Sequence, residues 1–207
     1  MVQHIVIKKL GLRDYQQTWQ EMRDFTLSRG ESTPDEVWLL EHPPVFTQGM
    51  AGKPEHVLNP GNIPIIHTDR GGQVTYHGPG QLVGYVLLDL RRLKIGVKAY
   101  VSLIENSVVQ LLAEYNIKAD IKPGAPGVYV AGKKICSIGL KISRGCSYHG
   151  IALNVNNDLE LFSRINPCGF QNLQMTKISD FVPVTLEEVG QKFCEKLNEC
   201  LASIHSS

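Results

Sequence analysis

The apolar run QLVGYVLLDL at residues 81–90 constrains the fold of this chain more than any other segment. A nearly unbroken apolar run is typical of a strand that is buried on both of its faces. We therefore expect this strand to lie inside a sheet that other elements cover on both sides.

The rest of the chain alternates between strand-like and helix-like patterns. Leu12, Tyr15, Trp19 and Met22 recur at helical spacing before Gly30, and Thr185 and Glu188 fit a capping box. The patterns predict helices at 12–29, 97–116 and 186–204, and strands at 36–42, at 149–156 and, joined at Ala131-Gly132, within 127–143. This order indicates an α/β (α+β) fold in which helices flank a mixed sheet.

Composition bounds the class of protein. The 207 residues carry a formal net charge of +1, and 43% are hydrophobic. We expect one domain over 1–207, with no membrane partner and no charge field suited to nucleic acid. The spacing of the five cysteines matches no zinc framework, and the N-terminal MVQHIVIKKL does not resemble a secretion signal. A reducing cytoplasm is the expected location.

The segment RGGQVTYHGPGQ at 70–81 leads directly into the apolar run. Gly71 and Gly72 allow a backbone to approach a ligand closely, and His77 precedes the turn signal Gly78-Pro79-Gly80. A plain glycine-rich turn before a strand explains the segment equally well. It is not a phosphate-binding P-loop, because it lacks GxxxxGK[ST].

The segment GKKICSIGLKISRG at 132–145 holds two adjacent lysines. Regular strand alternation would place Lys134, Cys136 and Ile138 on one face. A lysine beside a buried strand is usually a solvated edge charge, but Lys133 can take that part and leave Lys134 pointing inward. Cys136 and Cys146 are expected to be packing thiols, like Cys194 and Cys200 on the last helix. A Cys146–His149 metal pair is disfavoured because further ligands are lacking nearby.

The segment INPCG at 165–169 places Cys168 between a proline and a glycine. Pro167 restricts the backbone before the thiol, and Gly169 permits an unusual conformation after it. A free cysteine has a pKa near 8.5, so a nucleophilic role needs a nearby cation or base. Lys134, His77 and His149 are the candidates. These residues alone leave open whether Cys168 is a nucleophile or a turn residue.

Together the three segments resemble the lipoyl(octanoyl) transferase family. The resemblance runs from EVWLLEHPPVFTQG (36–49) to QMTKISD (174–180) and includes GKKICSIGLKISRGCSYHGIALNVN and INPCG. It implies the fold of biotin and lipoate ligases in one catalytic domain. It also implies an ATP-independent acyltransferase that moves an octanoyl group from acyl carrier protein to a lysine of a lipoyl domain, the first step of endogenous lipoate synthesis.

The resemblance also assigns residues. It implies a nucleophilic Cys168, which carries the acyl group as a thioester, and a Lys134 partner. The acyl-binding positions implied are Arg70, Gly71, Gly72, Gln73, Val74, Thr75, Tyr76, His77, Ser137, Ile138, Gly139, Gly150, Ile151 and Ala152. No cofactor or metal is expected, because the acyl group arrives on the phosphopantetheine of acyl carrier protein.

The implied partners are octanoyl-acyl carrier protein and the lipoyl domains of 2-oxoacid dehydrogenases and of the glycine cleavage H protein. Because acyl carrier proteins are acidic, a basic docking patch is expected, with Arg91, Arg92, Lys94 and Lys98 as candidates. A solvated loop and helix start explains that cluster equally well. A monomer is expected, because no long exposed apolar stripe is evident.

Two alternatives compete with this interpretation. An ATP-dependent lipoate or biotin ligase on the same fold would need no cysteine nucleophile, so INPCG argues against it. A non-catalytic acyl-binding protein would keep the pocket without the chemistry, and the joint presence of Cys168 and Lys134 argues against that.

Overall fold

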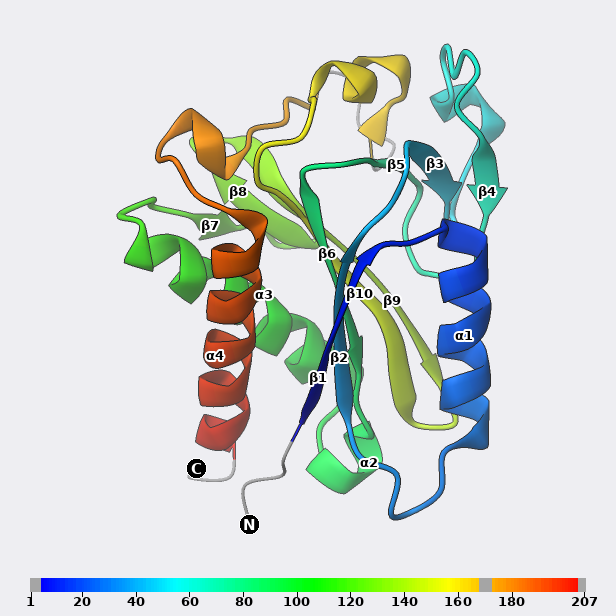
Figure 1. Ribbon diagram of the computed structural model, residues 1–207, viewed down its shortest axis with the longest axis vertical. Coiled ribbons are helices and arrows are strands. Elements are labelled where there is room, and N and C mark those ends of the chain that lie inside the picture. The colour runs from blue at the N-terminus through cyan, green and yellow to red at the C-terminus, as the bar shows by residue number, and fades with distance from the viewer. Residues whose placement is uncertain (1–4, 168–172, 205–207) are drawn as a thin grey trace.

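The computed structural model describes residues 5–167 and 173–204, and a seven-stranded sheet forms its centre (Figure 1). The first two strands pair in parallel and the other neighbours pair antiparallel, so the sheet is mixed, as predicted. In spatial order its strands are β1 (Val6–Leu12), β2 (Glu36–Glu41), β6 (Gln81–Leu87), β10 (Cys146–Asn154), β9 (Lys133–Ser143), β8 (Gly127–Val130) and β7 (Asp120–Ile121).

A second sheet of three short strands lies beside the first. Its spatial order is β4 (Ile65–His67), β3 (Val45–Gln48) and β5 (Val74–His77), with β3 parallel to β4 and antiparallel to β5. Strand β5 lies inside the segment 70–81. The glycine-rich segment is therefore a loop followed by a strand, which positions the segment's side chains in a fixed order.

Helices cover both faces of the large sheet (Figure 1). Helices α3 (Val97–Glu114) and α4 (Leu186–Ile204) pack together on one face, and α1 (Tyr15–Ser28) lies on the other. Short helical turns complete the described elements: α2 (Leu90–Leu93) and the 3₁₀ turns η1 (Pro54–His56), η2 (Glu160–Arg164) and η4 (Ile178–Asp180). No helix in the described ranges is long and apolar enough to cross a membrane.

Strand β6 is buried along its whole length, as the apolar run predicts. Leu82 and Val86 pack into the core under α3 and α4, whereas Val83, Tyr85 and Leu87 pack under α1. The predicted strand ran to residue 90, but the observed strand ends at Leu87. The reason is Asp89, whose carboxylate caps α2 by accepting the backbone N–H groups of Arg91 and Arg92.

Capping also sets the ends of the long helices. Asp14 accepts the N–H of Gln17 at 2.9 Å, so α1 begins at Tyr15 and the predicted first residue, Leu12, belongs to β1. Thr185 accepts the N–H of Glu188 at 3.2 Å, so α4 starts where the sequence signal places it.

Candidate active site

A β-bulge in β9 determines where Lys134 points. Val128 pairs with Cys136 and Tyr129 pairs with Lys134, so β9 carries one extra residue, Ile135, between the two pairs. Directly paired residues share a face, and neighbours along β8 alternate, so Lys134 and Cys136 lie on opposite faces. The prediction that they share a face is wrong, because simple alternation ignores the bulge. Lys134 instead lies on the face of Ser137.

The side chain of Lys134 is buried, whereas the adjacent Lys133 is exposed, as the sequence suggested. Its Nζ lies 5.4 Å from the centre of the Tyr129 ring. Its stem passes so close to Gly127 that a Cβ on that glycine would lie 2.5 Å from Cε of the lysine. The bulge and the glycine together admit a buried amine at this point of the sheet.

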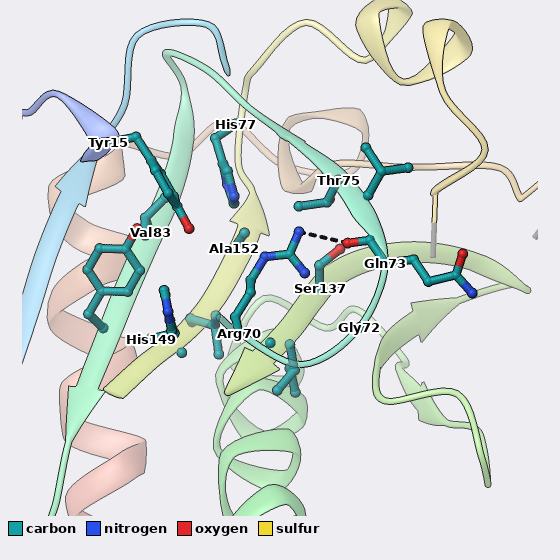
Figure 2. A pocket seen from close by; sticks show the side chains of 16 residues that line it. Tyr15, Arg70, Gly72, Gln73, Thr75, His77, Val83, Ser137, His149 and Ala152 are labelled. Carbon is teal, nitrogen blue, oxygen red and sulfur yellow. Dashed lines mark hydrogen bonds between the residues drawn. The ribbon is translucent and has the colours of Figure 1, made fainter. Parts of the chain in front are cut away.

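An inner cavity lies between the two sheets, on the side of α1 (Figure 2). It is lined by backbone and side chains from β5, β6, β9, β10 and the loop before β5. The lining includes twelve of the fourteen acyl-binding positions that the resemblance implies: Arg70, Gly72, Gln73, Val74, Thr75, His77, Ser137, Ile138, Gly139, Gly150, Ile151 and Ala152. Segments 70–77, 137–139 and 150–152, far apart in sequence, are thus brought together around one space.

Arg70 holds the loop that closes this cavity. Its buried guanidinium donates to the backbone carbonyls of Thr47 (2.6 Å), Gln73 (2.8 Å) and Gly71 (2.9 Å), and Figure 2 shows its side chain at the centre of the cavity. The loop also binds the part of β9 that β8 does not pair with, where the N–H of Gly71 donates to Leu140 O at 2.8 Å. Arg70 therefore shapes the wall and presents its aliphatic stem to the cavity.

The end of the cavity away from Ser137 is formed by His149, which an acidic residue fixes in place. Its Nε2 lies 3.0 Å from Asp69 Oδ1, and the hydroxyl of Tyr148 and the indole N–H of Trp19 donate to the same carboxylate. Partial burial opposes ionisation of Asp69, but the hydrogen bonds from His149, Tyr148 and Trp19 outweigh it and hold its pKa below the usual range.

Because Nε2 of His149 donates to the carboxylate, its Nδ1 is an acceptor when the ring is neutral. Nδ1 is buried and has no hydrogen-bond partner among the described residues. Burial lowers the pKa of this histidine, although Asp69 opposes the shift. The ring is therefore a neutral, fixed end wall.

Two further histidines near the cavity are neutral for the same reason. His77 is held between Gln81 (2.8 Å) and Thr47 (3.2 Å), and burial sets its pKa well below the usual value. His42 contacts Arg13 O and the Tyr85 hydroxyl at 2.7 Å each, and burial lowers its pKa to about 4. No imidazolium charge thus opposes an apolar ligand at neutral pH.

Lys134 borders a second, outer cavity, which extends along β9 beyond its pairing with β8. Val97 and Val101 of α3 form its far side. Four residues line both cavities, so the two adjoin there: Gly72, Gln73, Ile138 and Gly139. The buried lysine thus belongs to a cavity that adjoins the inner one.

Cys168 lies outside the described residues. The residues on either side of its segment, Pro167 and Leu173, line a common hollow with Lys133. Gln174 O accepts the backbone N–H of Lys134 at 2.8 Å. Both ends of the segment are thus anchored on the side of the molecule that carries Lys134.

Burial makes three of the described cysteines, Cys136, Cys146 and Cys194, poor nucleophiles. Burial raises the pKa of Cys136 and Cys194 to about 12 and also raises that of Cys146. Cys200 is half-buried on α4 and contacts Gln110. Packing roles for these thiols agree with the expectation from their positions in the sequence.

Comparison with known proteins identifies the family. Residues 14–198 match the family described as the lipoyl protein ligase A/B catalytic domain. A Vibrio vulnificus protein named octanoyltransferase is 61% identical over 198 residues, covering 95% of this chain and 91% of the relative. An octanoyltransferase of Saccharophagus degradans is 58% identical, covering 94% and 93%. This chain belongs to the lipoyl protein ligase A/B family. It is an acyltransferase of the octanoyltransferase group.

Solved structures with low sequence identity show that the family shares its fold with ligases. A lipoate-protein ligase A bound with ATP superposes with a TM-score of 0.80 at 16% identity, covering 98% of this chain and 86% of the other. A lipoate protein ligase from Thermoplasma acidophilum, solved with its E2 lipoyl domain, gives 0.79 at 17% identity, covering 97% and 84%. The biotin/lipoate ligase-like fold is thereby confirmed.

Some family positions lie differently from the expectation, and some lining residues were not foreseen. Tyr76 does not line the inner cavity; it packs against Phe46 and Phe162 on the other side of β5. Gly71 borders the outer cavity instead. The lining residues that the sequence did not place in a site are Tyr15, Val83 and Tyr85; His149, named there as a candidate partner of Cys168, also lines the cavity. Helical spacing marked Tyr15 as inward-facing, and only the tertiary structure shows that this face meets a cavity.

Two of the four basic residues proposed for docking near α2 already form ion pairs within the protein. Arg91 pairs with Asp89 at 2.9 Å, and Arg92 pairs with the buried Asp35 at 2.7 Å. Lys98 follows Val97, which lines the outer cavity. Of the four candidates for docking, the lysines are better suited than the arginines to meet a partner.

Proposed function

We propose that this enzyme moves an octanoyl group from acyl carrier protein to a lysine of a lipoyl domain through a thioester on Cys168. The observation that carries the proposal is the buried amine of Lys134 in a cavity that adjoins the one lined by the expected acyl-binding segments. A cation in this position favours a nearby thiolate by charge pairing.

In the first half-reaction the Cys168 thiolate attacks the carbonyl carbon of the incoming thioester. The new C–S bond forms as the bond to the phosphopantetheine sulfur breaks, and the leaving thiolate takes up a proton. One thioester replaces another, so the exchange is nearly isoenergetic and needs no ATP.

In the second half-reaction the target lysine attacks as a neutral amine. Its nitrogen forms the amide bond, the bond to the Cys168 sulfur breaks, and the nitrogen loses a proton. Lys134, in its deprotonated form, is the group best suited to accept that proton. Its burial supports this role, because burial disfavours the ammonium form.

The inner cavity suits an eight-carbon chain. The Ser137–Ala152 and Leu140–His149 pairs are three residues apart along β9, about 10 Å of strand, which is comparable with an extended octanoyl chain. Burying about six methylenes contributes roughly 5 kcal/mol. The fixed ring of His149 would end the chain's path.

The partners follow from this chemistry. The acidic carrier protein would dock beside the outer cavity, near Lys94 and Lys98, and the lipoyl domain would present its lysine after the carrier leaves. In this scheme the enzyme itself needs no cofactor, since the acyl group arrives already activated.

A mass measurement tests the proposal. Wild-type protein is mixed with octanoyl-acyl carrier protein in the absence of ATP, and its intact mass is recorded. One octanoyl group should appear on Cys168, should be absent in Cys168→Ser, and should be discharged by adding a lipoyl domain.

Adjacent lysines supply a matched control. Lys134→Met should slow acyl transfer by a hundredfold or so, within the range for loss of a general acid-base group, whereas Lys133→Met should retain wild-type rates because Lys133 is exposed. An unmodified wild-type mass, with activity only after adding ATP and free acid, would instead support a ligase. Ligand binding without modification under either condition would support a non-catalytic protein.

A further inference from the structure

Helix α3 carries a buried carboxylate that the proposed mechanism does not use. Glu105 is only 6% exposed, and it lies one helical turn beyond Val101, which follows Val97 by another turn. Val97 and Val101 line the outer cavity that Lys134 borders. Glu105 thus continues the side of α3 that carries the two valines lining this cavity. Carboxylates are rarely buried without a compensating donor or cation.

A single glycine connects this carboxylate to Lys134. Oε1 of Glu105 accepts the backbone N–H of Gly127 at 3.1 Å. On its other side, a Cβ on Gly127 would lie 2.5 Å from Cε and 3.2 Å from Nζ of Lys134. Only glycine backbone separates the two side chains, and these steps place Oε1 within about 9 Å of Nζ.

Both charges act on one neighbouring group. Burial is the main cause of the raised pKa of the Cys136 thiol; the Lys134 ammonium lowers that pKa and the Glu105 carboxylate raises it to smaller extents. Lys134 and Glu105 therefore share a poorly solvated region, in which charges interact more strongly than at the surface.

We propose that Glu105 is a positioning residue for Lys134: it anchors Gly127 against the lysine stem, and its negative charge favours the ammonium form. The role in acyl transfer rests on the function proposed above. The carboxylate would keep Lys134 protonated while the thiolate forms, yet leave it able to exchange a proton when the acceptor amine attacks.

Among the described residues, strand β7 adds one further carboxylate on the lysine's face, Asp120, which pairs with Tyr129 and is exposed to solvent. Strand β8 contributes the Tyr129 ring, which also carries Lys122 at 4.3 Å from its centre. The loop before β5 contributes Gly71, Gly72 and Gln73 to the cavity that Lys134 borders, and residues 174–176 contribute uncharged groups. Cys136, on the lysine's own strand, is neutral at pH 7 because its pKa is about 12. Glu105 thus supplies a buried negative charge, whereas water screens the exposed Asp120.

The test separates charge from anchoring. Glu105→Gln keeps an oxygen that can accept the Gly127 N–H but removes the charge, whereas Glu105→Ala removes both. Protein labelled with ¹³C at lysine Cε is titrated by NMR, and Lys134→Arg assigns the signal of Lys134. Glu105→Gln should lower the pKa of Lys134 by about one unit, the size expected for charges at this separation.

The matched control is Glu114→Gln, which removes a carboxylate from the same helix where it pairs with Lys192 and Lys196. This variant should leave the Lys134 titration unchanged. In transfer assays, the pH profile of Glu105→Gln should move to lower pH with a maximum within about threefold of wild type, and Glu105→Ala should be slower at every pH.

An unchanged Lys134 pKa in Glu105→Gln would overturn the inference. The proposed function is judged separately, because the titration needs no turnover: a shifted pKa in a protein that transfers no octanoyl group would refute the transferase mechanism and leave the coupling intact.

Discussion

Gly127 and Lys134 occupy adjoining space that leaves no room for a methyl group. A Cβ on Gly127 would lie 2.5 Å from Cε of the lysine and 2.6 Å from the carbonyl oxygen of Cys136. Gly127 also has φ +132°, in the region that favours glycine. Both the backbone conformation and the lack of space therefore require a glycine at position 127.

Gly127→Ala should consequently reduce both stability and activity. Strain and overpacking together should lower the free energy of unfolding by about 2–4 kcal/mol, and displacement of Lys134 should slow acyl transfer at least tenfold. Urea unfolding and transfer rates provide the measurements.

Gly124→Ala is the control for this change. Gly124 also has a positive φ, of +76°, but a Cβ there would meet nothing within 4 Å. It should show only the conformational penalty, about 1 kcal/mol, with activity retained. Equal effects of the two variants would show that contact with Lys134 is unimportant.

Enlarging the end of the inner cavity should change chain-length preference. His149 has φ +60°, so glycine can replace it without strain and removes the whole ring. In His149→Gly, decanoyl transfer should gain on octanoyl transfer by up to about fifteenfold, since each buried methylene is worth about 0.8 kcal/mol. Competition between octanoyl- and decanoyl-carrier protein measures the ratio.

Tyr148→Phe provides the comparison. It removes one hydrogen bond to Asp69, and Tyr148 is not part of the cavity lining. In this variant the ratio of decanoyl to octanoyl transfer should stay within about twofold of the wild-type ratio, because the binding free energy changes by less than that of one buried methylene. A preference for octanoyl that persists in His149→Gly would place the end of the acyl path elsewhere.

The sequence predicted the elements that local pattern controls. The buried strand at β6 and the helices α3 and α4 follow from periodicity and capping, whereas the pattern left open whether Lys134 is a solvated edge charge or points inward. The face of Lys134 was mispredicted because the bulge at Ile135 depends on pairing between β8 and β9. Such pairing is a tertiary property that alternation cannot reveal.

The candidate site shows the same division. The segments that resemble the family identified most of the cavity lining, whereas their glycines alone fitted a plain turn equally well. They could not identify Glu105, which lies on a predicted helix and becomes notable only where α3 meets Gly127. His149 was recognisable as a polar residue, but its contact with Asp69 joins residues eighty positions apart.

Acid should destabilise the protein through its buried histidines. The folded-state pKa of His42 is about 4, whereas the unfolded value is about 6.5. The unfolded state alone binds the proton between these values, so stability is full above pH 6.5 and falls by up to about 1.4 kcal/mol per unit as the pH drops towards 4. His77 and His149, whose pKa values are also lowered, add to this slope.

His42→Gln tests the contribution of one histidine. Glutamine can donate to Arg13 O and accept from the Tyr85 hydroxyl, as the neutral ring does. Urea unfolding between pH 4.5 and 7.5 gives the free energy of unfolding at each pH. Its slope against pH should be smaller in the variant, by the equivalent of nearly one bound proton. A slope equal to that of wild type would mean that His42 titrates alike in both states.

Charge reversal at the start of α3 should weaken binding of the acidic carrier. Lys98 follows Val97 at the outer cavity, whereas Lys118 lies beyond the other end of the same helix. Lys98→Glu should raise KM for octanoyl-acyl carrier protein about fivefold at low salt, with kcat unchanged, because a rim charge chiefly affects association. The effect should shrink at 0.5 M salt. Lys118→Glu makes the same change in net charge and should leave KM near the wild-type value; an equal rise in both variants would indicate a general charge effect and no docking patch at Lys98.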